Sequence, residues 1–180
     1  MKKLFITAVF SLFTFIVVAQ EWQKFKSETF EFTADYPGEP KYSTQEIPTG
    51  VGNLTMHMFM LSELPPESKN AVYSVIRSDY PEDMFEEPEE GYIKTVLDGA
   101  VNGAVTNVNG RLLIDNSITF NGYPGRSIKI AIEGAYIYIR CYLVKNIMYI
   151  SQVVTLDVHE DNADIDKFHD SFELIKVKHD

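Results

Sequence analysis

The sequence has very little cysteine and little positive charge. Of its 180 residues only Cys141 carries a thiol, which excludes an intramolecular disulfide, a zinc site built from cysteines and a CxxC redox pair, because each needs at least two thiols. Lys and Arg number 16 against 26 Asp and Glu, which gives a net charge of -10. The chain therefore repels polyanions, and nucleic acid is not an expected partner.

Short catalytic motifs are also missing. The sequence contains no G-x-S-x-G nucleophile turn, no H-E-x-x-H metal motif and neither of the glycine-rich phosphate loops,. His57 is isolated within an apparent strand, and His179 lies beside the C-terminus, so neither belongs to a recognisable triad. We therefore expect a protein that is not an enzyme and that needs no cofactor.

Long hydrophobic runs are absent except at the start of the chain. Lys2 and Lys3 precede an apolar run over residues 4–18, which is shorter than the roughly 20 residues of a membrane-spanning helix. Ala19 is a small residue at position −1 of a cleavage site and Val17 is tolerated at position −3, so we expect a signal peptide over residues 1–19, cleaved after Ala19. An uncleaved anchor is the alternative, and the absence of a following cysteine argues against lipoprotein processing.

Cleavage of this segment predicts an exported protein, periplasmic or extracellular, without stable insertion in a membrane. Loss of the two lysines leaves 14 basic against 26 acidic residues and a net charge of -12. Residues 20–180 contain no internal repeat, low-complexity tract or linker. They are expected to form a single domain.

Alternation of apolar and polar residues predicts strands over most of the mature chain. In the first half of the chain we predict one strand or a strand pair over residues 22–36, a hairpin formed by 41–47 and 53–61, and a strand at 71–77. In the second half we predict an antiparallel meander of four strands over 111–120, 127–133, 135–145 and 147–156. A closing strand is predicted at 172–177. In the second arm of the hairpin, Leu54, Met56, Met58 and Met60 share one face.

Two segments have helical periodicity instead. Two apolar rows, each repeating every fourth residue, predict a broad buried helix over residues 91–105 that packs on a sheet,. Gly99 and Gly103 within it are expected to allow a close approach to that sheet. A short helix is predicted over residues 161–171,.

The strand around Cys141 contains the most unusual pattern of the sequence. Ile137, Ile139, Cys141 and Leu143 alternate on one face, so the thiol is interpreted as part of a core. The opposite face carries Tyr136, Tyr138, Arg140 and Tyr142. These side chains could stack on a planar or sugar ligand; alternatively, a helix covers them or they stabilise a half-exposed sheet.

Acidic residues gather in two places. One is the run over residues 79–90, which is interpreted as a solvated loop or as a docking site for a basic partner,. The other combines carboxylates and imidazoles that could bind a divalent cation, although helix capping also explains them. Its members are Asp157, His159, Glu160, Asp161, Asp164, Asp166, His169 and Asp170.

Several short motifs occur in the order typical of one family. They are Phe-Glu-Phe-Thr-Ala-Asp-Tyr-Pro-Gly at residues 30–38, Gly-Tyr-Pro-Gly-Arg at 122–126, tyrosine-rich strands up to Leu156, and Ile-Asp-Lys-Phe-His-Asp-Ser-Phe at 165–172. With them the chain resembles the Mog/PsbP-like superfamily, whose exported bacterial members include proteins of unknown function. The resemblance implies an α+β fold, namely an α/β/α sandwich around a mainly antiparallel sheet of about six to eight strands.

Members of that superfamily act as small accessory or interaction proteins, such as a photosystem subunit and a Ran-binding protein. The leading hypothesis is therefore a non-enzymatic exported accessory protein that docks on another protein of the cell envelope. The first alternative is a small-ligand binding module that uses Tyr136, Tyr138, Arg140 and Tyr142. The second is a metal-dependent hydrolase that uses the carboxylates and imidazoles between Asp157 and His169.

Overall fold

The computed structural model describes residues 22–49, 52–86 and 90–176. The predicted signal peptide, the turn residues 50–51 of the predicted hairpin, residues 87–89 of the acidic run and the C-terminal residues 177–180, with His179, lie outside these ranges. Within the described ranges, no helix combines the length and the apolar character needed to cross a membrane.

The strands form two antiparallel sheets. A three-stranded sheet has the order β1-β2-β10, and a seven-stranded sheet has the order β3-β4-β5-β9-β8-β7-β6. The smaller sheet contains β1 (Gln23–Ser27), β2 (Phe32–Tyr36) and β10 (Glu173–Leu174). The larger one contains β3 (Lys41–Thr49), β4 (Gly52–Leu61), β5 (Asn70–Asp79), β6 (Arg111–Phe120), β7 (Tyr123–Ile132), β8 (Ala135–Val144) and β9 (Ile147–Leu156).

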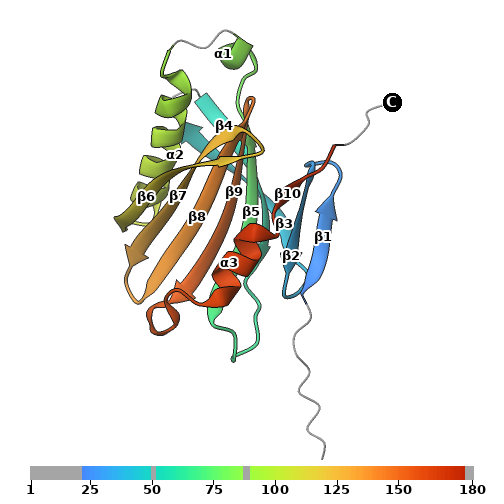
Figure 1. Ribbon diagram of the computed structural model, residues 1–180, viewed down its shortest axis with the longest axis vertical. Coiled ribbons are helices and arrows are strands. Elements are labelled where there is room, and N and C mark those ends of the chain that lie inside the picture. The colour runs from blue at the N-terminus through green and yellow to red at the C-terminus, as the bar shows by residue number, and fades with distance from the viewer. Residues whose placement is uncertain (1–21, 50–51, 87–89, 177–180) are drawn as a thin grey trace, which may run out of the picture.

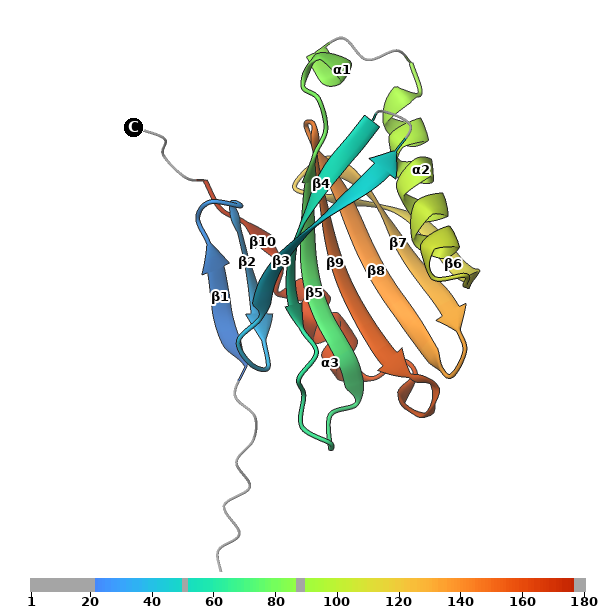
Figure 2. The same ribbon diagram turned by 180° about the vertical axis from the view of Figure 1, so that it is seen from behind.

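Helices cover both faces of the larger sheet, as an α/β/α sandwich requires. Figure 1 shows α3 (Ala163–Asp170) on one face, beside the small sheet, and Figure 2 shows α2 (Tyr92–Asn107) on the opposite face. The short α1 (Asp83–Glu86) lies at the end of the molecule where α2 begins, and a 3-10 turn, η1 (Asp157–His159), precedes α3. The predicted α+β class and the size of the central sheet are confirmed.

The two faces of the larger sheet bury cores of different composition. The core on the α3 side is rich in aromatic rings, because the small sheet and α3 both pack there; it includes Phe32, Tyr36, Phe59, Tyr73, Tyr142, Tyr149, Phe168 and Phe172. The core on the α2 side is mostly aliphatic; it includes Val96, Leu97, Val101, Ile128, Ile130, Ile137, Ile139, Cys141, Leu143 and Met148. Cys141 is therefore a core residue, as predicted.

The meander β6-β7-β8-β9 matches the predicted strands, with a tighter first turn. Asn121 and Gly122 both have positive φ, 51° and 83°, which is the geometry of a two-residue hairpin turn. Tyr123 and Gly125, which lie outside the predicted strands 111–120 and 127–133, already belong to β7. Gly125 is needed in the strand, because a Cβ there would lie 2.3 Å from the carbonyl oxygen of Cys141 on β8.

One expectation from the sequence is corrected, and one strand pairing had not been expected. A Cβ on Gly99 or Gly103 would meet nothing within 4 Å, so these glycines do not serve a close approach of α2 to the sheet. The pairing of the last strand with the first ones was not predicted either. Glu173 pairs with Thr33, although most of the sequence separates the two residues. A local sequence pattern does not predict a contact between residues so far apart in the sequence.

Candidate functional site

The tyrosine and arginine side chains of β8 share one face, and that face is the one that α3 covers. Arg140 reaches α3 through two ion pairs, Nη1 to Asp170 Oδ1 at 2.5 Å and Nη2 to Asp166 Oδ1 at 2.9 Å. Tyr142 is only 5% exposed. Its ring packs on those of Phe120 and Phe172, with centroid distances of 4.8 and 5.9 Å. These two residues of the proposed ligand face thus contact the protein's own aromatic core and helix.

The other two tyrosines of this face surround a lysine from β7. The ammonium of Lys129 lies 4.8 Å from the ring centroid of Tyr136 and 4.9 Å from that of Tyr138. Glu160 and Asp161 neutralise it, with Nζ 3.1 Å from Asp161 Oδ1. Burial lowers the pKa of Lys129, but its hydrogen bonds to Glu160, Tyr138 and Asp161 raise it more, so the ammonium stays charged. The cation-π partner of the two tyrosines is therefore supplied by the chain itself.

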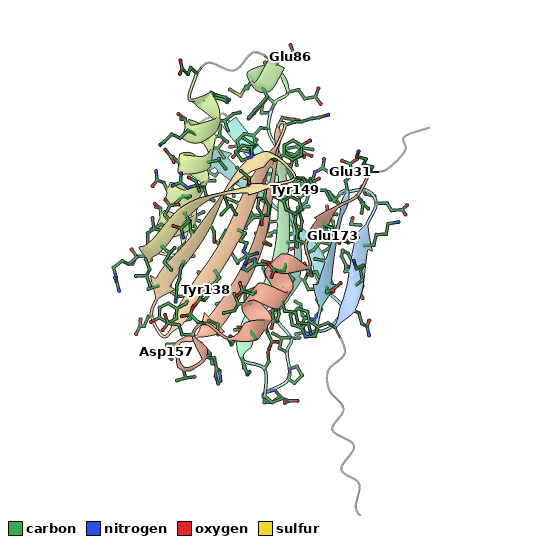
Figure 3. All side chains as sticks on the ribbon, in the orientation of Figure 1. Glu31, Glu86, Tyr138, Tyr149, Asp157 and Glu173 are labelled. Carbon is green, nitrogen blue, oxygen red and sulfur yellow. The ribbon has the colours of Figure 1, made fainter. Side chains whose placement is uncertain are left out.

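A small cavity lies between α3 and strands β7 and β8. Its volume is about 60 Å³, and its lining includes Ser127, Tyr138, Arg140, Asp166 and His169. Figure 3 shows Tyr138 at the edge of this region, on the face of the sheet that carries α3. The space is large enough for water or a single small group.

His169 is the most perturbed titratable group of this region. Its Nδ1 lies 2.7 Å from Ser151 Oγ, while its Nε2 is buried without a hydrogen-bond partner within the described ranges. Burial, and then the nearby charge of Arg140, lowers the pKa of His169 to about 3. The imidazole is therefore neutral at physiological pH. Its contact with Ser151 joins the buried side of α3 to β9.

The carboxylates between Asp157 and Asp170 do not converge on a metal position. Asp161 binds Lys129 and Tyr138, whereas Asp166 and Asp170 bind Arg140. Asn162, rather than an aspartate, caps α3 by accepting a hydrogen bond from the amide of Asp164 at 3.2 Å. Among the residues described, no three His, Cys, Asp or Glu side chains are placed to hold a metal ion. The acidic cluster mainly fastens α3 and the turn before it, Glu160 and Asp161, to β7 and β8.

Sequence reasoning did not identify a surface cluster around His57. The His57 ring lies 4.6 Å from the ring of Phe30, and its Nδ1 is 2.9 Å from the hydroxyl of Tyr42. Arg77 stacks nearby, with its guanidinium carbon 5.9 Å from the Phe30 ring and 5.6 Å from the Tyr149 ring. The register of the β3-β4 hairpin places Tyr42 near His57. Tyr42 pairs with Phe59, and His57, two residues before Phe59 on the same strand, points to the same face of the sheet,.

The side of the sheet that carries α2 has an apolar region that this helix does not pack on. Met56, Met58 and Met60 alternate on one face of β4, as predicted, and all three are half-buried. They belong to neither of the two buried cores of the described chain. Met58 pairs with Ile76, which in turn pairs with Ile150, so these methionines lie on the α2 side of the sheet, beside the core of that side. We call Met56, Met58 and Met60 the methionine face.

Exposed acidic residues gather at one end of the sheet that carries the methionine face. Between residues 79 and 93 the sequence contains no lysine or arginine, while Glu82, Asp83, Glu86 and Glu90 are exposed. Figure 2 shows α1 at the same end of the molecule as the end of β3 and the start of β4, and Figure 3 places Glu86 there. This end of the protein therefore carries several exposed carboxylates, and the methionine face begins beside it, where Met56 pairs with Ser78.

Comparison with solved structures identifies the fold. Cyanobacterial PsbP (CyanoP) from Synechocystis sp. PCC 6803 matches with a TM-score of 0.53 and 13% identity, over 88% of this chain and 95% of that one. The chain thus has the Mog/PsbP-like fold, and the resemblance seen in the sequence is confirmed for the fold. A protein of unknown function from Pseudomonas aeruginosa, PA94, a putative regulator, matches with a TM-score of 0.37 and 10% identity, over 77% of this chain and 85% of that one. No protein-family model and no curated protein matches the sequence.

Proposed function

We propose that this protein is an exported, non-enzymatic interaction protein of the cell envelope that binds another envelope protein. The observation that carries the proposal is the methionine face, an apolar sheet surface of Met56, Met58 and Met60 that belongs to neither core of the described chain. A sheet face of this composition is normally covered. Export, to the periplasm or the exterior, is inferred from the cationic start and the apolar run of residues 4–18,.

The proposed partner segment is an amphipathic helix with basic residues along its edge. The same side of the sheet is already covered in part by α2, so a second helix laid beside it would continue the existing layer. Methionine side chains are flexible and polarizable, and they adapt to a partner surface. Glu82, Asp83, Glu86 and Glu90 favour a positively charged partner at this end of the molecule,.

A buried hydroxyl beneath the methionine face adds a polar feature to this surface. Ser74 pairs with Met60 and with Gln152. It is 0% exposed, and its Oγ has no hydrogen-bond partner within the described residues. Buried hydroxyls are normally hydrogen-bonded, because an unmade bond costs about 1–3 kcal/mol. A polar group of the partner that reaches Ser74 when Met60 moves would satisfy it.

The test uses a defined probe, a synthetic amphipathic helix of leucine and lysine, with a leucine and glutamate helix as its control. Binding is measured by fluorescence anisotropy on wild type, on Met58→Asp and on Glu82→Lys/Glu86→Lys. The matched control is Glu39→Lys/Glu67→Lys, which makes the same change of net charge at two other exposed positions.

We expect the basic helix to bind wild type and the control variant alike, and Met58→Asp to weaken binding by about tenfold. Glu82→Lys/Glu86→Lys should also weaken it. Met58→Asp separates docking from simple charge attraction, because the added carboxylate strengthens attraction but disrupts an apolar contact. Binding that is unchanged or stronger in Met58→Asp contradicts the proposal.

A further inference from the structure

The methionine face is a row of sulfur atoms as well as an apolar surface. Met56, Met58 and Met60 lie within one short stretch of β4 and are all half-buried, so solvent reaches part of each side chain. The remaining methionines of the described chain are placed differently. Met148 is buried in the α2-side core, and Met84 Sδ accepts a hydrogen bond from a tyrosine hydroxyl of α2 at 3.6 Å. The thioethers of the described chain therefore gather on one strand.

The side chains around the methionine face contain no hard metal ligand. The strand register gives its neighbours on the same side of the sheet, which are Lys41, Ser43 and Gln45 on β3 and Ser74, Ile76 and Ser78 on β5. None of these six is a carboxylate or an imidazole. His57 of β4 points to the other side of the sheet, where Tyr42 and Phe30 contact its ring. Thioether sulfur is therefore the main donor that this face offers to a metal ion.

We propose that the methionine face binds a soft monovalent cation, Cu(I), through its thioethers. Thiolates and thioethers select Cu(I), whereas carboxylates, carbonyls and water suit magnesium, calcium and manganese. The single thiol of the chain, Cys141, is buried, which leaves the thioethers as the accessible soft ligands. Because thioethers are uncharged, the bound ion keeps its positive charge, and the chain's net charge of -10 favours a cation,.

The spacing along β4 determines which methionines can share one ion. Alternate residues of a strand start about 7 Å apart, and residues four apart start about 13 Å apart. A methionine side chain has three rotatable bonds, so the sulfurs of two neighbouring methionines can turn towards a common ion. Met56 and Met60 start too far apart to share one. Met58 therefore belongs to every possible pair of sulfur ligands, and either Met56 or Met60 completes the pair.

The neighbours on β3 favour Met56 over Met60 as the second ligand. Lys41 pairs with Met60, and although Glu63 binds its ammonium, a positive charge beside the site disfavours a second cation. Met56 instead pairs with the neutral Gln45. Because β3 is an edge strand and Gln45 is exposed, the ion can approach from that edge of the sheet. The site is therefore centred on Met56 and Met58.

Copper binding goes beyond the proposed docking function, because it needs no partner protein. The same side chains serve both, but docking depends on their apolar shape and copper binding on their sulfur. Replacing methionine by leucine keeps an apolar side chain of similar volume and removes the sulfur. Met58→Leu should therefore still bind the leucine and lysine helix and fail to bind Cu(I). Loss of one property without the other tells the two proposals apart.

The test is competition for Cu(I) between the mature protein and a chromophoric Cu(I) chelator, without oxygen and with ascorbate as reductant. The variants are Met56→Leu, Met58→Leu and Met60→Leu. Met84→Leu is the matched control, because Met84 is also half-buried but lies in α1 rather than β4. Thermal melting confirms that each variant is folded.

We expect wild type and Met84→Leu to bind one Cu(I) per chain equally well, and Met58→Leu to raise the dissociation constant at least about tenfold. Met56→Leu should raise it more than Met60→Leu. Ag(I), a soft cation of the same charge, provides a second readout, since it should shift the methyl NMR signals of Met56 and Met58 but not that of Met84. A wild type that does not compete for Cu(I), or binding that Met58→Leu leaves unchanged, overturns the proposal.

Discussion

Arg140 on β8 and Asp170 at the end of α3 form an ion pair with 2.5 Å between Nη1 and Oδ1. Together with Asp166, Asp170 holds the arginine at the outer edge of the helix, while His169 contacts Ser151 on its inner side. The helix is therefore clamped to β8 and β9 by polar contacts on both sides of its hydrophobic stripe. The guanidinium of Arg140 is thus bound by two carboxylates of α3.

Replacing the arginine should have a modest effect on stability. We expect Arg140→Met, which keeps an apolar stem, to lower the free energy of unfolding by about 1 kcal/mol, because Asp166 and Asp170 are 75% and 68% exposed and water screens both pairs,. Urea unfolding measures the change. The double variant Asp166→Asn/Asp170→Asn should lose a similar amount. A gain in stability in either variant would contradict the claim that the ion pairs of Arg140 stabilise the packing of α3 on β8.

The buried histidine predicts a specific dependence of stability on pH. The pKa of His169 is lowered to about 3 in the folded protein, from about 6.5 in an unfolded chain. The unfolded state therefore binds the proton first. The contribution of His169 to stability is fully present above pH 6.5, falls as pH decreases, and is lost as pH falls through about 3,.

Comparison with a variant isolates this effect from the carboxylates that titrate at lower pH. Between pH 6 and 5, wild type should lose up to about 1.4 kcal/mol per pH unit more stability than His169→Gln. Chemical unfolding at several pH values gives the two slopes. Equal slopes for the two proteins in this window contradict a buried, neutral imidazole.

Two glycines should respond to the same substitution with opposite signs. Gly125→Ala places a methyl group 2.3 Å from the Cys141 carbonyl oxygen, so the strands must separate, at a cost of about 1–3 kcal/mol. Gly99→Ala adds a methyl group in open space within α2, where alanine favours the helix by up to about 1 kcal/mol. Thermal unfolding should show a lower melting temperature for the first variant and a higher one for the second. Equal shifts in one direction would be inconsistent with the packing of β7 on β8.

Export predicts a defined N-terminus for the mature protein. If signal peptidase cleaves after Ala19, intact-mass measurement of the exported protein gives a chain that begins at Gln20 and lacks Lys2 and Lys3,. Ala19→Arg should prevent cleavage and leave the precursor with the membrane fraction. Recovery of the full-length chain in the soluble exported fraction would contradict the assignment.

The sequence was informative about strands and their faces, because alternation is a local property. It placed Tyr138 and Arg140 on one face of β8 and Cys141 on the other, as the structure shows. It did not reveal what covers the Arg140 face. Arg140 and Asp170 are 30 residues apart, and alternation within a strand carries no information on which later segment packs against it.

Contacts between elements were likewise beyond local patterns. His57 looked isolated because its contact with Tyr42 depends on the register of β3 against β4. Gly99 and Gly103 looked like packing positions because they lie within an apolar helix, but helical periodicity does not state how closely a sheet approaches. The methionines were assigned to one face of β4 correctly. Their position outside both buried cores became visible only when the helix was placed over the sheet.

The central claim is that the methionine face holds a partner in the envelope, and site-specific photo-crosslinking tests it most directly. A benzophenone amino acid replaces Met58 in the native cell, and Tyr42 serves as the control, since it belongs to the same hairpin and is 52% exposed. We predict a discrete adduct with one envelope protein from position 58 that is absent from position 42 and lost in Glu82→Lys/Glu86→Lys. No adduct from position 58, or the same adduct from both positions, would contradict the account.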